Sequence, residues 1–446
     1  MLNMKDSGIE WIGEIPKDWK VIKAGRIGEF STSSVDKLIR ENEKNIKLIN
    51  YTDVYKNTKK IINNQTSNMI VTATKSQKNN NNLLKGDLLF TPSSESINDI
   101  GYSALINEDL KNTCYSYHLL RLRFSLKIDD NYKRYLFNNT FVLNQFSQKA
   151  KGTTRKTLGL NDFKSIKLVL PSLEEQIKIA NFLDEKCDTI DELTKDIQSQ
   201  IETLENYKKS IITEAVTKGL NPNVEMKGSK TDWIQDIPKG WDVSKVKYLF
   251  SNCKGLSITK TDLIEEGLPV ISYGQIHSKS NTGVKISDDL IRYVSFSYQE
   301  KNPQCRVYKN DFIFADTSED FEGCGNAIYK RDDNLLYAGY HSIILHSKEN
   351  RDNSYFAYLF RTDKWRKQLR ELAAGVKVYS ITQKILINAQ IIIPSEDEQK
   401  EIVQYLDDKC RGIDSIITDK KKQLEVLEQY KKSIIYEYVT GKKEVI

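Results

Sequence analysis

Cysteine, proline and histidine are scarce in this chain, and their scarcity excludes several classes of protein. The 446 residues include six cysteines, eight prolines and four histidines. No two cysteines form a C-x-x-C pair, so the sequence offers neither a zinc knuckle nor a disulfide framework. We therefore expect no metal site and a reducing compartment.

Long apolar runs are absent as well. No stretch reaches eighteen consecutive apolar residues, and the first twenty residues carry acids and tryptophans where a signal peptide needs an apolar core. The sequence therefore predicts a cytoplasmic protein. No Walker A pattern occurs either, so we do not expect this chain to supply energy from ATP.

The composition is that of a globular protein with a long charged helix. Hydrophobic residues make up 39% and charged residues 29% of the chain. Sixty-seven basic against sixty-one acidic residues leave a net charge of +6, which permits a polyanionic partner without requiring one. At roughly 100 to 200 residues per domain, the length predicts two to four domains.

The chain repeats itself. The segment WIGEIPKDW at 11–19 recurs as WIQDIPKGW at 233–241, a displacement of 233 − 11 = 222. KGDLLF at 85–90 recurs as KNDFIF at 309–314. YKKSII at 207–212 recurs unchanged at 430–435, a displacement of 430 − 207 = 223. These repeats at a nearly constant displacement indicate that the chain contains a duplicated unit.

Each copy has two physically different parts. The first part carries short apolar and β-branched runs between Asn, Gly and Ser clusters, which predicts a mixed α/β domain. The second part begins with an S-x-x-E capping box directly after a proline, at Ser172 and again at Ser395, which predicts a helix start. We expect globular domains at 1–170 and 219–393, and long helices at 171–218 and 394–446.

The two long segments have coiled-coil spacing. From Ile190 to Ile211 and from Ile413 to Ile434, apolar or long side chains recur at steps of three and four residues. No proline or glycine interrupts the first segment before Gly219, whereas Gly412 interrupts the second and predicts a kink or break there.

The G-E-I-P segment at 13–16 with Trp19, the helix start at 171–176, and the alternation of two globular parts with two long helices are similar to the specificity subunit of type I restriction–modification enzymes. The resemblance covers nearly the whole chain, although no single motif is a signature. It implies an α+β fold of two target recognition domains, separated by two long helices that pack as an antiparallel coiled coil with an internal pseudo-two-fold repeat.

The resemblance also implies a function without catalysis in this chain. Each recognition domain would read one half of a bipartite, asymmetric site on double-stranded DNA, while the helices set the spacer and dock two methyltransferase subunits. Those partners would bring S-adenosylmethionine and methylate adenine, and two restriction/translocase subunits would bring ATP and Mg. Two alternatives stay open: the reader part of a split fused enzyme, and a coiled-coil scaffold that never touches nucleic acid.

Two matched loops are the first candidates for DNA contact. Glycine, hydroxyl groups and cations suit phosphate binding, and arginine also reaches guanine edges. In the family this loop lies near DNA; the alternative is an ordinary solvated loop. The candidates are Lys151, Thr153, Thr154, Arg155 and Lys156 in the first copy and Lys377, Tyr379 and Ser380 in the second.

Further candidates have equally simple alternatives. Ser93, Ser94, Thr317 and Ser318 follow matched strands and either bind phosphates or form turns. Arg121 and Arg123 share one strand face, which contacts DNA or is merely exposed. His118 and His341 occupy equivalent positions, where the sequence favours satisfied core histidines.

The duplicated hexapeptides are the candidates for partner docking, because identical patches suit two copies of one partner. Their alternative role is to close the intramolecular helix pair. The residues are Tyr207, Lys208, Ile211, Tyr430, Lys431 and Ile434.

Two motifs resemble those of adenine methyltransferases but are interpreted as accidental. F-E-G-C-G at 321–325 matches the F-x-G-x-G of S-adenosylmethionine binders, yet the corresponding loop of the first copy lacks it. N-P-Q-C at 302–305 lacks the aromatic that would hold a flipped adenine. We therefore expect no cofactor in this chain.

Overall fold

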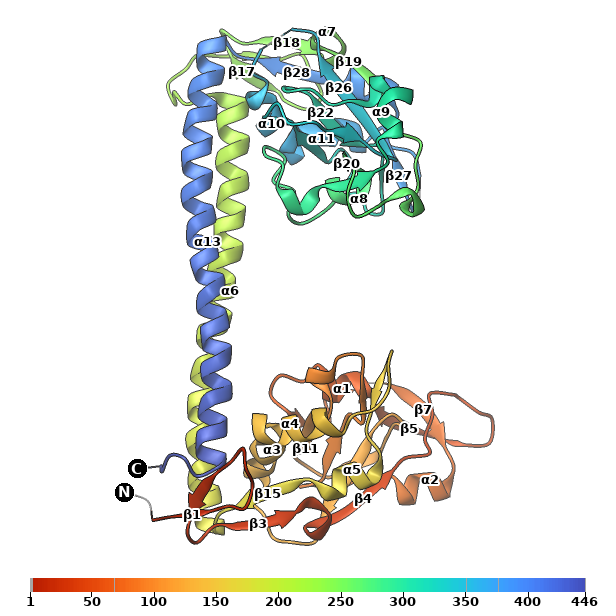
Figure 1. Ribbon diagram of the computed structural model, residues 1–446, viewed down its shortest axis with the longest axis vertical. Coiled ribbons are helices and arrows are strands. Elements are labelled where there is room, and N and C mark those ends of the chain that lie inside the picture. The colour runs from red at the N-terminus through yellow and green to blue at the C-terminus, as the bar shows by residue number, and fades with distance from the viewer. Residues whose placement is uncertain (1–2, 68, 350, 376, 446) are drawn as a thin grey trace. The chain divides into compact units, whose positions relative to one another are not determined.

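The computed structural model describes residues 3–67, 69–349, 351–375 and 377–445 (Figure 1). Its contacts divide the chain into two units. The first comprises Met1–Gln198 and Lys421–Ile446, and the second comprises Ser199–Lys420. Each unit contains one globular part and portions of both long helices.

The globular part of the first unit is a mixed α/β structure. Its strands are β1 (Met4–Asp6), β2 (Glu14–Pro16), β3 (Lys20–Lys23), β4 (Gly28–Thr32), β5 (Lys44–Ile49), β6 (Ile61–Ile62), β7 (Ile70–Ala73), β8 (Asn82–Leu83), β9 (Leu88–Phe90), β10 (Ser93–Ser94), β11 (Ser103–Ile106), β12 (Leu110–Tyr115), β13 (Leu120–Phe124), β14 (Lys156–Thr157) and β15 (Lys167–Leu170). Its helices are α1 (Tyr51–Tyr55), α2 (Lys75–Asn80), α3 (Asp130–Asn138), α4 (Thr140–Lys149) and α5 (Leu160–Ser165), with 3-10 turns η1 (Ala24–Arg26) and η2 (Ile97–Asp99).

Two sheets organise this part. One has five strands in the order β4-β13-β9-β11-β6, and the other has four in the order β7-β5-β12-β8. Phe90 on β9 packs against the rings of Phe137, Phe146 and Phe163, which come from α3, α4 and α5. The aromatic core therefore lies between the five-stranded sheet and these helices.

The globular part of the second unit repeats this plan. Its strands are β16 (Met226–Gly228), β17 (Asp236–Pro238), β18 (Asp242–Lys245), β19 (Phe250–Lys254), β20 (Leu268–Ile271), β21 (Arg292–Val294), β22 (Phe312–Ala315), β23 (Thr317–Ser318), β24 (Ala327–Tyr329), β25 (Tyr337–Ala338), β26 (Ser342–Ser347), β27 (Tyr379–Ser380) and β28 (Gln390–Ile393). Its helices are α7 (Val246–Leu249), α8 (Tyr273–Ile276), α9 (Ser297–Lys301), α10 (Ser354–Arg361), α11 (Asp363–Arg370) and α12 (Gln383–Asn388), with turns η3 (Lys260–Asp262), η4 (Asp288–Leu290) and η5 (Pro303–Cys305).

Here the sheets are β19-β26-β22-β24 and β21-β20-β25. Phe312 and Phe314 on β22 pack against Phe360 on α10, and Phe314 also meets Trp365 on α11. The predicted mixed α/β fold is thus confirmed for both copies.

Both long helices begin where the capping boxes predict. α6 spans Leu173–Lys218 and α13 spans Glu396–Val439. The backbone N–H of Ser172 donates to Glu175, whose own N–H donates to the Ser172 hydroxyl; Ser395 and Glu398 make the same pair of bonds. Because these bonds satisfy amides that a helix start leaves unpaired, both predicted starts are confirmed.

The same glutamates also fix the repeated tryptophan segment. The indole N–H of Trp19 donates to Glu175 over 3.1 Å, and that of Trp241 donates to Glu398 over the same distance. Both indoles are buried. Each globular part is therefore tied to the start of its own helix.

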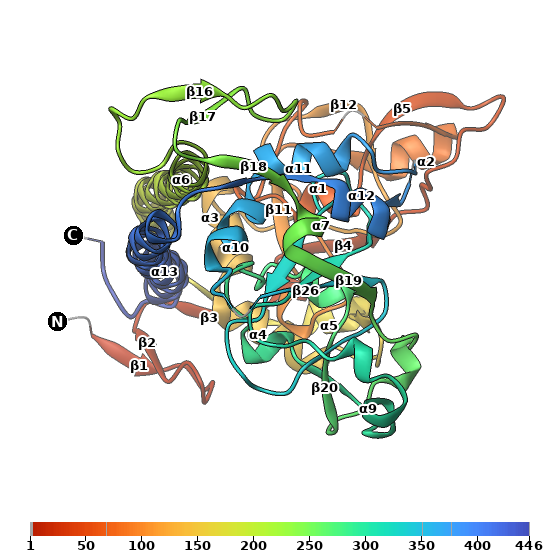
Figure 2. The same ribbon diagram turned by 90° about the horizontal axis from the view of Figure 1, so that it is seen from above.

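Within each unit the two helix portions lie side by side, as the end-on view of α6 and α13 in Figure 2 shows. In the first unit the Lys431 ammonium lies 2.5 Å from the Asp191 carboxylate. In the second unit Lys208 lies 2.6 Å from Asp414, and Ile211 packs with Ile413 in an apolar cluster. From Lys208 to Ile211 the residue numbers rise along α6, while those of their partners, Asp414 and Ile413, fall along α13. The two helices are therefore antiparallel.

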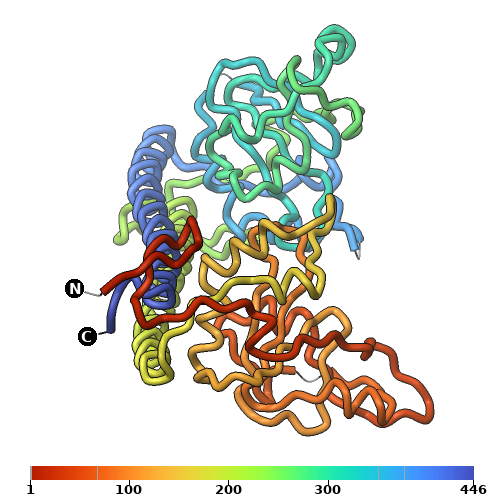
Figure 3. Tube along the Cα trace, turned by 60° about the horizontal axis from the view of Figure 1, so that its bottom comes forward, coloured from red at the N-terminus to blue at the C-terminus, as the bar shows by residue number. Residues whose placement is uncertain are grey.

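Gly412 does not interrupt the second helix, because α13 continues through it to Val439. The predicted break is wrong: a helix that is packed along one side tolerates a single glycine at a cost of about 1 kcal/mol. In the first unit the segment after α13 lies beside the first strands (Figure 3), where the Lys442 ammonium donates to the carbonyls of Ile12 and Glu14. No helix of the described part is long and apolar enough to cross a membrane.

Candidate nucleic-acid interface

The two predicted loops of the first unit meet in a short antiparallel pair. Ser93 of β10 lies opposite Thr157 of β14, and a bridge from Lys151 to Thr157 closes the intervening chain into a hairpin. We name residues 151–157 the first hairpin. Two segments that are about sixty residues apart in the sequence thereby form one feature.

The second unit builds the same feature from its own loops. Thr317 of β23 lies opposite Ser380 of β27, and a bridge from Ala374 to Ser380 closes the loop. Residues 374–380 form the second hairpin, within which Val376 lies outside the described residues. The sequence predicted that these loops correspond, but it did not predict that each packs on the Ser/Thr loop.

A glycine shapes the tip of each hairpin. Gly152 has φ +111° and Gly375 has φ +126°, a backbone conformation that residues with a side chain rarely adopt. A Cβ at Gly152 would collide with the carbonyl oxygen of Arg155, and one at Gly375 with that of Val378. Both tips therefore depend on glycine for their shape.

Most predicted side chains of the first hairpin reach solvent. Lys151, Thr153, Thr154 and Arg155 are exposed. The Lys156 ammonium instead turns back and donates to the Gly152 carbonyl over 2.6 Å. The exposed four therefore offer two cations and two hydroxyl groups on one tip.

The second hairpin offers a different surface. Lys377 and Val378 are exposed, whereas Tyr379 and Ser380 are half-buried. The Tyr379 ring packs edge-on against Phe321, with centroids 5.5 Å apart. The tip thus presents one cation and an apolar side chain.

Two of the predicted hydroxyl groups are turn formers and not surface contacts. Ser94 and Ser318 are buried, at 2% and 3% exposed. Their hydroxyls accept from the backbone N–H groups of Ser96 and Asp320. Because these short bonds shape the loop, the turn-forming alternative is correct for both; Ser93 and Thr317 stay half-exposed beside the hairpins.

Aromatic side chains beneath the first hairpin were missed by the sequence analysis. The Tyr51 hydroxyl donates to the carbonyl of Ser93 over 2.8 Å, and its ring stacks on Tyr55 at 5.3 Å. The Arg155 guanidinium lies 5.8 Å from the Tyr51 ring and donates to the Ser93 hydroxyl. Arg155 is thus held against a tyrosine with its guanidinium near the surface.

The second unit places a histidine where the first has a tyrosine. His277 corresponds to Tyr55, since 277 − 55 = 222, and its Nε2 donates to the Thr317 carbonyl over 2.8 Å. Its Nδ1 faces the amide nitrogen of Asn326 at 3.1 Å, so Nδ1 accepts and Nε2 carries the proton. The signal available in the sequence was the repeat of Asn50-Tyr51 as Ser272-Tyr273.

The predicted core histidines are instead at the surface near the hairpins. His341 is exposed, lies 3.3 Å from the Asp316 carboxylate, and its ring packs edge-on against Tyr273 at 5.5 Å. His118 is half-exposed in a turn, where partial burial and then the charges of Lys37 and Arg155 lower its pKa. The core prediction is wrong because both strands begin only after these residues, at Leu120 and Ser342.

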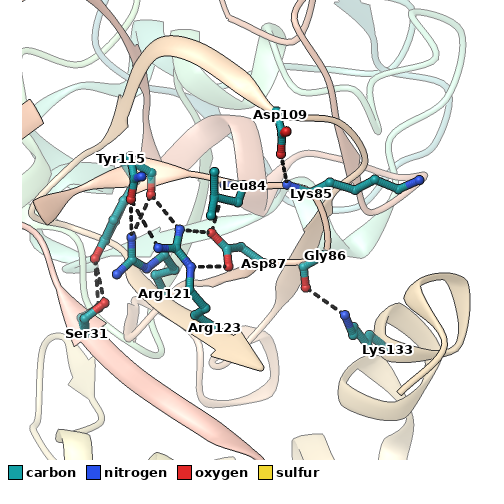
Figure 4. A network of polar contacts seen from close by, with 11 residues as sticks. Ser31, Leu84, Lys85, Gly86, Asp87, Asp109, Tyr115, Arg121, Arg123 and Lys133 are labelled. Atoms are coloured by element: carbon teal, nitrogen blue, oxygen red, sulfur yellow. Dashed lines mark hydrogen bonds and ion pairs between the residues drawn. The ribbon is translucent and has the colours of Figure 1, made fainter. Parts of the chain in front are cut away.

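Arg121 and Arg123 take part in an internal polar network (Figure 4). Arg123 binds both oxygens of the buried Asp87 carboxylate, at 2.9 and 2.6 Å. Arg121 is 8% exposed and donates to the carbonyl of Asn82. Alternation predicted one exposed strand face, but this face of β13 meets Asn82 of β8 and also Asp87, and carries an internal charge network instead.

The loop that carries the F-E-G-C-G segment at 321–325 is held in place by two buried arginines. Arg366 and Arg370 on α11 donate to the carbonyls of Cys324 and Glu322, and burial lowers the pKa of Arg366 to about 10. Phe321 from this loop packs on Tyr379. The loop therefore supports the second hairpin, a role that sequence inspection did not suggest.

The predicted docking patches largely close the helix pair. Lys208 and Lys431 form the ion pairs given above, while Ile211 and Ile434 are buried. For these four residues the intramolecular alternative is correct. Tyr207 and Tyr430 differ, because 53% and 54% of their surfaces are exposed.

A family model, the type I restriction modification DNA specificity domain, matches this chain twice, over residues 16–203 and 238–426. The chain belongs to that family. Each match covers one globular part and most of the helix that follows it, so the duplication inferred from the repeats is a duplication of the specificity domain.

Curated relatives agree. The type I restriction enzyme MjaVIII specificity subunit of Methanocaldococcus jannaschii is 29% identical over 73% of each chain. The putative MjaX specificity subunit of the same organism is 29% identical over 81% of this chain and 80% of its own. Such a specificity role is non-catalytic, as the sequence predicted.

Two solved structures share the fold of this specificity chain. A chain from a structure on complex assembly and conformational transition of the type I R-M system has a TM-score of 0.68 at 17% identity, covering 96% of this chain and 99% of that one. The HsdS subunit from Thermoanaerobacter tengcongensis has a TM-score of 0.50 at 16% identity, over 96% and 98%.

Proposed function

We propose that each unit of this specificity chain reads one half of a bipartite, asymmetric site on double-stranded DNA. The observation that carries the proposal is the duplicated hairpin on its Ser/Thr loop. Both hairpins expose cations on a glycine-shaped tip, which suits the phosphate backbone. The two tips differ in side chains, and different side chains select different bases.

Arg155 is the strongest candidate for reading a base in the first half-site. Its guanidinium is held by the Ser93 hydroxyl and the Tyr51 ring, which limits its orientations before DNA binds. An oriented guanidinium pairs with two acceptors on a guanine edge, and such a pair discriminates by about 1 to 3 kcal/mol. Lys377, Tyr379 and the nearby His341 are the corresponding candidates in the second unit.

The helices have the length and pairing to set a spacer. At 1.5 Å per residue, the 46 residues of α6 extend about 70 Å. The exposed tyrosines Tyr207 and Tyr430 recur on the two helices and suit two copies of one methyltransferase subunit. With two restriction/translocase subunits, those partners would supply S-adenosylmethionine, ATP and Mg chemistry.

The test uses the full chain together with its methyltransferase partner. Arg155→Ala and Lys377→Ala should each lower DNA affinity, and each should reduce the salt dependence by about one counterion where a phosphate contact is lost. Sequencing of methylated adenines should show relaxed bases in one half-site only.

Lys17→Ala provides the matched control, because Lys17 is an exposed cation outside both hairpins. It should leave affinity and methylated sequence unchanged. Wild-type affinity and salt slope for both hairpin variants would rule out the hairpins as DNA contacts.

A further inference from the structure

The second unit contains a hydrogen-bonded row of three side chains that takes no part in the proposed DNA contacts. These side chains are Cys253, His346 and Asp311. The sulfur of Cys253 on β19 lies 3.3 Å from Nε2 of His346 on β26, and Nδ1 of His346 lies 2.7 Å from the Asp311 carboxylate. Asp311 is 2% exposed. A thiol, an imidazole and a carboxylate in this order are the arrangement that activates a cysteine nucleophile.

The row opens into a pocket of about 570 Å³. Gln304, Tyr308 and Lys348 are among its other lining residues, and Lys309 and Glu349 add one charge of each sign. The volume lies within the range of small-molecule sites, about 300 to 1,000 Å³. Three cations of the lining, Lys309, Lys348 and the protonated His346, stand against the two carboxylates Asp311 and Glu349, so the lining favours an anionic molecule over a cationic one.

The first unit shows which part of the row is structural. Asp311 corresponds to Asp87, since 311 − 87 = 224, and His346 corresponds to Arg123, since 346 − 123 = 223. Each aspartate is buried and paired with the cation of a neighbouring strand. The carboxylate–cation pair is therefore common to both copies and holds the fold.

The thiol and the imidazole are particular to the second unit. Cys253 corresponds to Ser31, since 253 − 31 = 222, and the Ser31 hydroxyl bonds to the Tyr115 hydroxyl and not to Arg123. The carboxylate–cation pair can form without a nearby sulfur and without a ring nitrogen directed at that sulfur. The contact between Cys253 and His346 thus adds chemistry that the first unit lacks.

The protonation of His346 favours a nucleophilic sulfur. Burial lowers the pKa of His346, but the hydrogen bonds to Asp311 and Cys253 and the charge of Asp311 outweigh it and raise the pKa to about 10. Both ring nitrogens then carry protons at neutral pH. Nδ1–H is directed at Asp311, and Nε2–H lies within reach of the Cys253 sulfur at 3.3 Å and of the Gln304 carbonyl at 3.4 Å, which also accepts from the Cys253 thiol over 3.1 Å. An adjacent imidazolium stabilises a thiolate, which is the reactive form of cysteine.

Solvent exposure also distinguishes Cys253 from the other cysteines. Cys114, Cys187, Cys305, Cys324 and Cys410 are buried, whereas Cys253 is half-exposed. The pocket also lies apart from the second hairpin, because His341 directly precedes β26 and His346 lies near its far end, about 16 Å away at 3.3 Å per residue. The site is therefore separate from the proposed DNA contacts.

We propose that Cys253 is a modification site that exchanges with small anionic disulfides. The Cys253 sulfur forms a bond to one sulfur of the disulfide, the S–S bond of the reagent breaks, and the departing thiolate takes up the proton that Cys253 gave up. One disulfide replaces another, so no further oxidant is needed. His346 acts as a positioning residue that stabilises the thiolate.

The test measures reaction of the full native chain with oxidised glutathione at pH 7, with peptide mapping to identify the modified cysteine. Cys253 should react first, several times faster than a free thiol, because the adjacent protonated imidazole stabilises the attacking sulfur. Cys253→Ser should abolish the fast phase. A Cys253 rate equal to that of a free thiol would overturn the proposal.

Two variants separate activation from folding. His346→Gln should slow the exchange several-fold. His346→Arg copies the Arg123–Asp87 pair of the first unit, so it keeps Asp311 neutralised while removing the ring nitrogen at the sulfur. It should be equally slow and should melt like the wild type. If both variants react as fast as the wild type, His346 does not activate Cys253 and the proposal fails.

Discussion

Arg123 and Arg155 are both cations of the first unit, and the structure gives them opposite roles. Arg123 neutralises the buried Asp87 carboxylate, whereas Arg155 is exposed on the hairpin tip. Arg123→Met should lower the free energy of unfolding by about 3 kcal/mol, the low end for breaking a buried pair, because a third of the arginine is exposed.

Urea denaturation of the full chain checks this prediction. Arg155→Met is the matched control, since it makes the same substitution at an exposed site, and its midpoint should stay within experimental error of the wild type. Equal midpoints for both variants would mean that the Asp87 pair contributes nothing.

His346 makes the stability of the second unit depend on pH. The raised pKa of this group, about 10 against 6.5 for an ordinary histidine, means that the folded state binds the proton more tightly than the unfolded state. Its stabilisation is fully present below pH 6.5 and is lost as pH rises through 10. Since His346 is partly open to solvent, we expect a loss of only about 1 to 2 kcal/mol.

His346→Arg removes this dependence, because arginine stays charged throughout. The wild type should therefore lose stability relative to the variant between pH 6.5 and 10, as measured by the denaturant midpoint of each. A constant difference over that range would contradict the assignment of a bound proton to His346.

Single side chains were the hardest feature to predict from the sequence. Arg121 and Arg123 have the alternation of an exposed face, and His118 that of a buried one, yet the structure reverses both. Alternation reports which residues share a face but not what covers that face. The residues that cover it, such as Asn82 of β8 beside Arg121 and Arg123, come from distant parts of the chain.

The hairpins depend on their glycines at the scale of the element. Gly152→Ala and Gly375→Ala each place a Cβ against a carbonyl of the same turn at positive φ, so the tip must change shape. We expect each variant to weaken DNA binding several-fold, with about 1 to 2 kcal/mol of strain. Gel shift with the methyltransferase partner measures the change.

Gly240→Ala is the matched control for this pair. A Cβ at Gly240 meets no atom within 4 Å and its φ is not positive, so binding should be unchanged. Wild-type affinity for both tip variants would show that the shape of the tips does not matter for DNA.

Helix starts were predictable where the hairpins were not. The S-x-x-E boxes at Ser172 and Ser395 are local patterns whose hydrogen bonds form within one turn, and the structure contains those bonds. The pairing of β10 with β14 joins residues about sixty positions apart, and no local pattern encodes it. Only the repeat, which aligned both pairs of loops, indicated that these segments act together.

Duplication explains much of the whole molecule. Tyr135 and Asp184 in the first unit, like Tyr358 and Asp407 in the second, join a globular part to its helix by a tyrosine–carboxylate hydrogen bond. Such shared contacts hold the domain in place, whereas the tip residues differ between copies. If the hairpins read DNA as proposed, a chain that keeps these attachments and varies its hairpins would change one half-site without disturbing the other.

The proposed spacer role of the helices gives a prediction for the whole chain. One heptad inserted in α6 and one in α13, beside the Gln200–Lys420 contact, preserves the packing seam and adds about 10 Å, or about three base pairs. The methylated site should gain a longer spacer while the bases of each half-site stay the same. Three added base pairs also rotate the second half-site by about 100° around the DNA axis. The lengthened variant should therefore bind the lengthened site more weakly than the wild-type chain binds its original site.

A library of sites with varied spacers, read by sequencing methylated adenines, measures this change. The control inserts the same heptad after Asn223, in an exposed linker outside the helices, and should leave the spacer as it was. An unchanged spacer with the lengthened helices would mean that something other than helix length fixes the distance between half-sites. A changed base within either half-site would instead mean that the helices and the hairpins do not act independently.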